Sequence, residues 1–504
     1  MDRGLGDHAW ALLAPLKKHG THWRIAAPAD GALHLERVGP DPRPLSPPPE
    51  AEGVTHYACL LRYDYPQDRP GSTFGMAFRP VRHAAVDEEA PARPAEQDRA
   101  CVAELQAAVD VLQHYFAPEL ARQLLPAGSV KEPQGAWAEP APEEELRIVF
   151  ASCQYPAGLM DRNQATASCR ALAAAFDEAP PTRLLLLGDQ VYTDATYGLL
   201  EPTRLDDRYR RPYEELGSRG GPHGQLPQHF QRVLRTTPDD HEFRDNWEPD
   251  PQRPADRAFD RGLRAYWAQQ RGLPEAKAAQ NARSGAPLWR TESGVLADGA
   301  RWRLFIADSR TAREPRDEDS VHRALLLGER QTVELMQWLL DAPRDELKVV
   351  TTAAMLLPRT RLYVDEPLHQ DGWQGYPASL YSLLVHLCEN EMRNVVFLSG
   401  DAHVACNARV TVTHPDSGKS CVFESHHAPP LYAPYPFANE SRHGLLLHDA
   451  FDFTWRHGEQ ERRYRCRVDA TIPDETFQGY ALLRARPALG GWETEVEVAS
   501  SREA

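Results

Sequence analysis

Residues able to bind metal ions or phosphate follow several apolar segments of this chain directly. These residues are Ser152-Cys153 after RIVFA, Gly188-Asp189 after LLLL, Asp308-Ser309-Arg310 after LFIA, Gly400-Asp401-Ala402-His403 after VVFLS, and Asp239-Asp240-His241-Glu242 in a loop after VLRTTP. With the phenol of Tyr192, they offer sulfur, oxygen and nitrogen donors, a set that suits a transition metal beside a harder cation. A carboxylate shared between two ions would hold them ~3.5–4 Å apart.

The elements that must position these residues form an α/β pattern. Continuous apolar runs predict buried strands at 146–152, 183–187, 302–307, 348–352 and 394–399. Periodic apolar residues predict helices at 163–176, 327–342 and 379–391. Because ligands collect at the carboxyl ends of strands in such sheets, we expect the separate motifs to meet in one crevice. A glycine before each aspartate lets the chain turn sharply out of the sheet.

Upstream of these strands the sequence changes character. Residues 1–90 carry four short apolar runs, HWRIAA, ALHLERV, HYACLLRY and FGMAFRPV, separated by turn residues, which predicts an N-terminal β-rich domain. Residues 91–145 form a predicted linker with one amphipathic helix, spanning Val102 to Phe116. We assign residues 146–504 to the catalytic domain.

The composition is that of a folded, acidic protein. Among 504 residues, 57 Lys and Arg face 73 Asp and Glu, so the net charge of −16 disfavours nonspecific binding to nucleic acid. Eleven Trp, 17 Tyr and 15 Phe exclude disorder over the whole chain, and no apolar run is long enough to predict a membrane helix. Eight cysteines without a CxxC pair, and no export signal at the start, predict a cytoplasmic protein, although a trimmed signal would leave the same sequence.

Taken together, the motifs ASCQ, GDQVYTD, DDHEFRDNW, ADSR, LGERQ…WL and LSGDAH resemble those of the PhoD-like alkaline phosphatase D family, within the calcineurin-like metallophosphoesterases. The resemblance covers about Leu146 to Val410. It implies a four-layered α/β/β/α sandwich with a two-metal site at the sheet edge, preceded by a small β-sandwich-like domain.

The same resemblance assigns the metal ligands. It implies a ferric ion held by Cys153, Asp189, Tyr192 and His403, and a second ion, calcium, held by Asp189, Asp240 and Asp401. Phenolate and thiolate suit a strongly acidic metal, whereas a carboxylate site suits Ca²⁺, Mg²⁺ or Mn²⁺. Mn, Zn and Mg therefore remain alternatives.

Two features depart from the wider superfamily. The first motif is Ser152-Cys153-Gln154, where the superfamily has Asp-x-His. Thr352, Ala353 and Ala354 stand where the superfamily has a metal-binding His or a polar amide, so we expect fewer ligands around the second metal.

Two residues are candidates for catalysis. His241 follows Asp240 where the superfamily keeps a histidine near the leaving group, so it would protonate the departing alkoxide or orient the phosphate. The alternative is a supporting histidine bound to a carboxylate such as Glu242. Arg310 would offer its guanidinium to phosphate, or would pair with Asp308.

We expect a metal-dependent phosphoesterase that hydrolyses small phosphate mono- or diesters by attack of a metal-activated hydroxide. The alternative is a catalytically weakened metal-binding scaffold of the same fold. The sequence leaves open the choice between mono- and diesters. It also leaves open the oligomeric state. Adjacent His426 and His427 point to opposite sides of a strand and are not expected to share a metal.

Overall fold

The computed structural model describes residues 143–157, 162–194, 208–218, 220–250, 256–433, 444–457, 460–473 and 478–501, and the backbone of four strands before them. The chain divides into two compact units, residues 1–129, 156–166 and 193–225 in the first and 130–155, 167–192 and 226–504 in the second. In the described residues, no helix has the length and apolar character needed to cross a membrane.

The four strands before residue 82 form two antiparallel pairs. They are β1 (Trp23–Ala26) with β2 (His34–Arg37), and β3 (His56–Arg62) with β4 (Gly75–Val81). All four fall on the apolar runs expected to be strands. The predicted helix from Val102 to Phe116 lies outside the described residues, so the boundaries at 90 and 145 stay predictions. The first unit also holds α5 (Arg211–Gly217) and η1 (His223–Gln225).

One sheet of the second unit contains the first predicted strands. Its order is β18-β17-β5-β6-β7, with β14 paired to β5, and its strands are β5 (Leu146–Gln154), β6 (Arg183–Leu187), β7 (Leu234–Thr237), β14 (Pro430–Tyr432), β17 (Gly479–Ala488) and β18 (Gly491–Ser500). Strands β5, β6 and β7 run parallel, so their carboxyl ends share one edge. The C-terminal hairpin β17–β18 extends this sheet by antiparallel pairing with β5.

The second sheet has eight strands in the order β15-β16-β12-β13-β11-β10-β9-β8. Its strands are β8 (Arg290–Val295), β9 (Arg301–Ile306), β10 (Leu347–Thr352), β11 (Val395–Ser399), β12 (Cys406–Thr413), β13 (Ser420–His427), β15 (His448–His457) and β16 (Gln460–Thr471). The four central strands β9, β10, β11 and β13 are parallel. This sheet therefore also collects its carboxyl ends on one edge.

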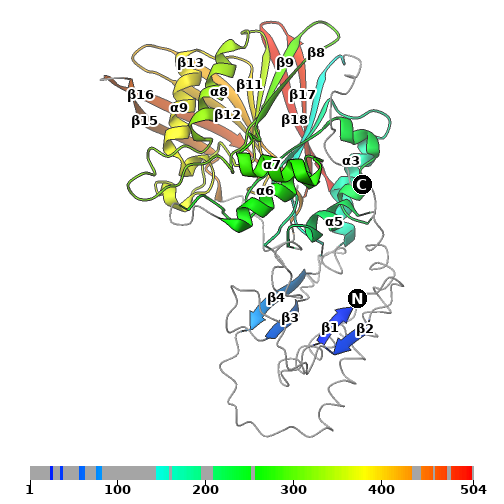
Figure 1. Cartoon of the computed structure of the whole chain (residues 1–504). Coiled ribbons are helices and arrows are strands. Elements are labelled where there is room, and N and C mark those ends of the chain that lie inside the picture. The colour runs from blue at the N-terminus through cyan, green and yellow to red at the C-terminus, as the bar shows by residue number, and fades with distance from the viewer. Residues whose placement is uncertain are drawn as a thin grey trace. The chain divides into compact units, whose positions relative to one another are not determined.

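Alternating side chains of β5 show how the layers stack. Ile148 and Phe150 pack against residues of β9, β10 and β11, so the two sheets face one another. Val149 and Ala151 point the other way, to α3 (Arg162–Ala175), whose residues from Ala167 onward belong to this unit. On the outer face of the eight-stranded sheet, α8 (Gly328–Asp341) and α9 (Pro377–Glu389) cover Phe305 of β9 and its neighbours (Figure 1). The α/β/β/α prediction is confirmed.

A helical excursion separates β7 from β8. It comprises α6 (Arg257–Gln269), capped by the Asp256 carboxylate, and α7 (Glu275–Ser284), and its core includes Tyr266 and Trp267. Phe243 and Trp247, from the loop after β7, are buried in the same core. Single turns η2 (Gln228–Arg232), η3 (Pro367–His369) and η4 (Trp373–Gly375) complete the elements of this unit.

Candidate metal centre

The predicted ligands lie together at the carboxyl ends of parallel strands from both sheets. Cys153 is near the end of β5, Asp189 follows β6, Asp240 follows β7, and Asp401 and His403 follow β11. All belong to the second unit. Apolar strands hold the backbone rigidly, and the polar residues begin where each strand leaves the core.

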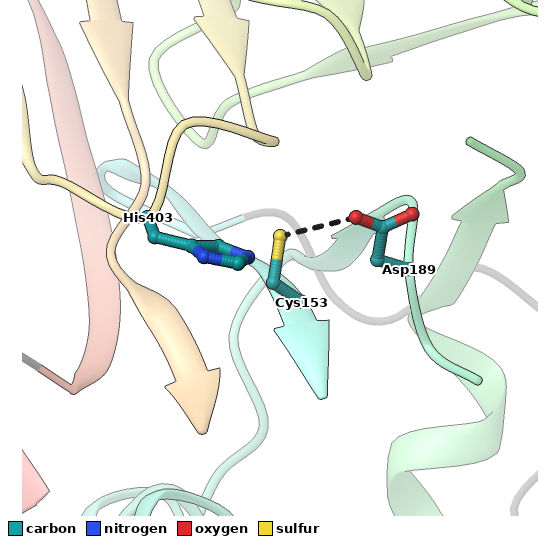
Figure 2. Close-up of side chains that lie close together, drawn as sticks. All are labelled: Cys153, Asp189 and His403. Carbon is teal, nitrogen blue, oxygen red and sulfur yellow. Dashed lines mark hydrogen bonds between the residues drawn. The ribbon is translucent and has the colours of Figure 1, made fainter. Parts of the chain in front are cut away.

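One ligand group combines a thiol, a carboxylate and an imidazole. Donor atoms of Cys153, Asp189 and His403 all lie within 4.8 Å of one another. Figure 2 shows the Cys153 sulfur between the His403 ring and the Asp189 carboxylate, with Sγ 3.5 Å from Asp189 Oδ2. The Tyr192 hydroxyl is 3.2 Å from His403 Nε2, which brings the phenol to the same place. These are the four residues expected around the first ion.

Two further groups share Asp189. Asp189, Asp239, Asp240 and Asp401 form an all-carboxylate set within 4.8 Å, and Asp189, Asp240 and His241 form another. Asp189 thus lies between a mixed sulfur and nitrogen site and a carboxylate site, the arrangement expected of a bridging ligand. Asp239 was not among the ligands expected from the sequence, although its place beside Asp240 was the available signal.

The ligand residues sit in an uncommon backbone conformation. Cys153, Asp189, Asp401 and His403 all have positive φ, of 55°, 56°, 80° and 54°. Non-glycine residues rarely adopt this region, and where they do the strain of ~1–3 kcal/mol each is concentrated at functional sites. Backbone bonds from Cys153 N–H to Gly188 O (3.1 Å) and from Gln154 N–H to Asp189 O (2.7 Å) tie two of these turns together.

Two glycines permit this crowding, for different reasons. Gly188 has φ of +88°, and a Cβ there would overlap the Cβ of Asp239. Gly400 lies outside the left-handed region. A Cβ at Gly400 would lie 2.6 Å from the Leu187 carbonyl oxygen and would collide with Ser152. The expected sharp turn is therefore present at Gly188, whereas Gly400 allows a close approach between the two sheets.

The electrostatics of the cluster favour a cation. Burial, and next the charge of Asp240, raise the pKa of Asp189 well above its usual range, and burial with the charge of Asp239 does the same to the pKa of Asp401. Burial raises the pKa of Asp239 to about 7 although Arg310 opposes it. A multivalent cation supplies the counter-charge that would stabilise these buried anions.

The thiol and the phenol behave in the same way. Burial, and then the neighbouring Asp189, raise the pKa of Cys153, while burial and Cys153 raise the pKa of Tyr192. Asp239 Oδ2 is buried and accepts no hydrogen bond from the described residues. An unpaired carboxylate oxygen inside an acidic cluster is suited to bind a metal ion. The residues present therefore fit a metal centre.

Arg310 occupies a different environment from the one expected. Its guanidinium is fully buried and binds Asp239 Oδ1 (2.7 Å from Nε), the Asp371 carboxylate (2.9 and 2.6 Å) and the Trp247 carbonyl (3.1 Å). Asp308 accepts a hydrogen bond from the Arg310 backbone N–H (3.0 Å) and others from Thr311, and no bond to the Arg310 guanidinium is present. The described geometry thus gives no support to a phosphate contact, and the structural pair involves Asp239 and Asp371 in place of Asp308.

His241 lies at the edge of the cluster. Its imidazole is 21% exposed, its ring centroid is 4.1 Å from that of Tyr192, and its Nε2 is 3.8 Å from Asp245 Oδ1. Glu242, the expected alternative partner of His241, accepts instead from backbone N–H groups of the ligand turns. A half-buried imidazole beside the two sites can donate a proton to a bound substrate.

The segment Thr352–Ala354 contributes structure and no ligand side chain. Thr352 accepts a hydrogen bond from the Trp373 indole (3.2 Å), the Ala353 carbonyl accepts from Gly400 N–H (2.9 Å), and Ala354 N–H donates to Ser309 (3.2 Å). Asp239 brings a fourth carboxylate to the second group.

The neighbouring histidines have separate roles. His426 bonds to Asn407 and Glu424, away from the ligand groups. His427 is buried, with Nδ1 2.8 Å from the Val404 carbonyl and Nε2 3.4 Å from Ala402 N–H. It therefore supports the turn that carries Asp401 and His403, and the two rings bind different partners.

Comparison with known proteins gives one family. A model of the PhoD-like phosphatase family matches residues 148–443, more than half of the chain. Among solved structures, the chain is similar to one titled "Structure of PhoD", with 14% identity over 75% of this chain and 70% of that one and a TM-score of 0.46. No curated protein matches.

Proposed function

The chain belongs to the PhoD-like phosphatase family, whose members are hydrolases of phosphate esters, and we propose that it cleaves small phosphate esters with two metal ions. The observation that carries this proposal is the convergence of seven candidate ligand residues from four strand ends, with Asp189 shared by all three groups. No single residue of that set indicates a metal centre by itself. A carboxylate shared between a site with sulfur and nitrogen donors and a site of carboxylates is, however, the arrangement used in two-ion hydrolysis.

The two proposed ions have different sets of ligands, which share Asp189. Cys153, Tyr192 and His403 with Asp189 would hold a ferric ion, because thiolate and phenolate are anionic donors suited to a strongly acidic metal. Asp189, Asp239, Asp240 and Asp401 include only oxygen donors, which suit calcium, manganese or magnesium. When bound, the ions supply Lewis acidity and positive charge for the attacking water and the phosphate oxygens.

The chain's own part in the reaction is to orient and to move a proton. Left-handed turns and buried strands fix the ligand atoms, so little reorganisation is needed on binding the substrate. His241, half-buried beside Tyr192, would donate its proton to the leaving alkoxide. The Arg310 guanidinium is held by carboxylates and would stabilise the Asp239–Asp240 turn.

The test of the acid role compares two leaving groups. In wild type and His241→Ala, kcat is measured with an alkyl and with a nitrophenyl phosphate ester, each as monoester and as diester. A general acid helps only the poor leaving group, so we expect a loss of ~10²–10⁴-fold for the alkyl ester and a much smaller one for the nitrophenyl ester. Equal losses, together with lower bound metal, would make His241 a metal-supporting residue.

The same assay separates the enzyme from a metal-binding scaffold of the same fold. A chain that holds both ions and cleaves none of the four esters above the rate of free metal is the scaffold. The ratio of rates for monoester and diester then decides which class of ester the site prefers.

A further inference from the structure

Glu242 is a fully buried carboxylate that touches both turns of the metal centre without belonging to any ligand group. Its Oε2 accepts hydrogen bonds from the backbone N–H groups of Asp189 (3.0 Å) and Asp239 (2.9 Å). Its Oε1 accepts from the Gln190 N–H (2.8 Å) and from the Gln270 side chain (3.0 Å). Both oxygens are thus occupied by N–H donors and are directed at backbone.

These bonds connect two strand ends that must keep a fixed spacing. Asp189 and Gln190 leave β6, whereas Asp239 leaves β7, and the carboxylates of Asp189, Asp239 and Asp240 must converge to within 4.8 Å. Like charges at that distance repel each other. A single carboxylate that accepts an N–H hydrogen bond from each turn keeps the two turns together against this repulsion.

The turn at Asp189 also needs this support because it is strained. Gly188 and Asp189 have φ of +88° and +56°, a conformation that persists only where the surroundings determine it. N–H groups that no strand can pair would be costly to bury, and the Glu242 carboxylate satisfies three of them at once.

Glu242 is itself held in place by the helical excursion. Phe243, the next residue, is buried with Trp267 in the core of α6 and α7, and Gln270 follows the last residue of α6. The helical core therefore fixes the carboxylate, and the carboxylate fixes the two ligand turns.

We propose that Glu242 is a positioning residue that sets the spacing between the bridging Asp189 and the Asp239–Asp240 turn, and so determines how tightly the chain holds its metal ions. This inference rests on the proposed two-ion function. It assigns Glu242 no contact with metal or substrate, since both carboxylate oxygens face N–H donors.

The test is a Mn²⁺ titration of the metal-stripped full chain, followed by the electron paramagnetic resonance signal of free Mn²⁺, with thermal unfolding measured in parallel. Glu242→Gln keeps the size of the side chain but turns one acceptor oxygen into an N–H₂ donor aimed at N–H groups. We expect the Kd for Mn²⁺ to rise about 10–100-fold, as for other residues that orient metal ligands.

A matched control is Glu292→Gln. Glu292 is a partly buried carboxylate, 16% exposed, but it binds Arg183 and Arg235. Arg183 is the first residue of β6, at the end of the strand opposite Asp189. This variant should lower the Tm and leave the Kd for Mn²⁺ within about twofold of wild type, a threshold well below the effect expected at Glu242.

The outcomes separate the two proposals. If the wild type binds two Mn²⁺ and cleaves phosphate esters but Glu242→Gln leaves the Kd unchanged, only the role of Glu242 is overturned. If the wild type binds no Mn²⁺, the proposed function is overturned as well. Equal rises in Kd for Glu242→Gln and Glu292→Gln would show general destabilisation and also overturn the inference. If Glu242→Gln does not fold, Glu242→Asp decides: it keeps the charge but is too short to reach both turns, so an unchanged Kd refutes the role.

Discussion

Replacing Gly188 with alanine should lower metal binding and activity, whereas the same replacement at a glycine outside the metal centre should leave both unchanged. Gly188 has φ of +88°, and a Cβ there would overlap the Cβ of Asp239 and lie 3.3 Å from both the Ala353 Cβ and the Asp239 backbone nitrogen. The added methyl group would therefore push directly on the loop that carries two carboxylates of the second group.

The size of the effect follows from two separate costs. A left-handed backbone costs an alanine ~1–2 kcal/mol relative to glycine. The overlap adds an overpacking cost of ~1–3 kcal/mol, because carbon atoms settle about 3.5–4.0 Å apart and the two turns must separate by about 1 Å. A displacement of about 1 Å at a reacting centre can lower the rate about 10²-fold.

Gly299→Ala isolates the first cost. Gly299, in the turn between β8 and β9, has φ of +90° and nothing within 4 Å of its Cβ position. Urea unfolding, metal content and hydrolysis of a nitrophenyl phosphate ester are measured for both variants. We expect comparable backbone penalties, with loss of metal and activity in Gly188→Ala alone. A Gly188→Ala variant with wild-type metal content and rate would refute the argument that close packing of these turns positions the ligands.

Three further predictions concern other parts of the second unit. The purified wild type should absorb visible light through a phenolate–Fe(III) band that Tyr192→Phe removes; a colourless protein with stoichiometric zinc or manganese contradicts the ferric proposal. Asp371→Asn should lower the free energy of unfolding by about 3 kcal/mol or more in urea, because Arg310 loses its bidentate partner inside the protein, and a change below about 1 kcal/mol contradicts this. Although burial opposes it, Lys419 and the other groups that contact Glu389 lower the pKa of Glu389 to about 2. Glu389→Gln should therefore lower the free energy of unfolding by about 1–2 kcal/mol at pH 7. That difference should persist down to about pH 4.5 and vanish as the pH falls to about 2, as measured by thermal unfolding; a pH-independent difference would exclude the ion pair as its cause.

The buried strands and the candidate residues at their ends leave local signals in the sequence, whereas the four-layered arrangement was implied by the family resemblance. Apolar runs mark strands buried on both faces, and a chemically reactive residue directly after such a run is placed at the edge of the sheet. Cys153, Asp189, Asp401 and His403 were all found in this way, and the structure brings them together.

What the sequence did not show depends on long-range geometry. The Arg310 guanidinium pairs with Asp371, 61 residues further along the chain, and nothing near Arg310 indicates that partner. The bonds of Glu242 go mainly to backbone N–H groups, which have no sequence signature. The return of β17 to pair with β5 likewise joins segments more than 300 residues apart.

The left-handed ligand residues could not be foreseen either. A glycine suggests positive φ, as at Gly188, but Cys153, Asp401 and His403 also adopt it, which is uncommon for residues other than glycine. Tertiary contacts impose that conformation, and only the folded chain shows them.

Metal analysis of the purified full chain beside its Asp189→Ala variant tests the central claim most directly. Asp189 is shared by every candidate ligand group, so its loss should affect both ions. We predict about two metal ions per chain in the wild type, a loss of both on dialysis of Asp189→Ala, and a fall in phosphate ester hydrolysis by orders of magnitude. A metal-free wild type that hydrolyses phosphate esters, or an Asp189→Ala variant with a full metal complement and most of its activity, would contradict the account.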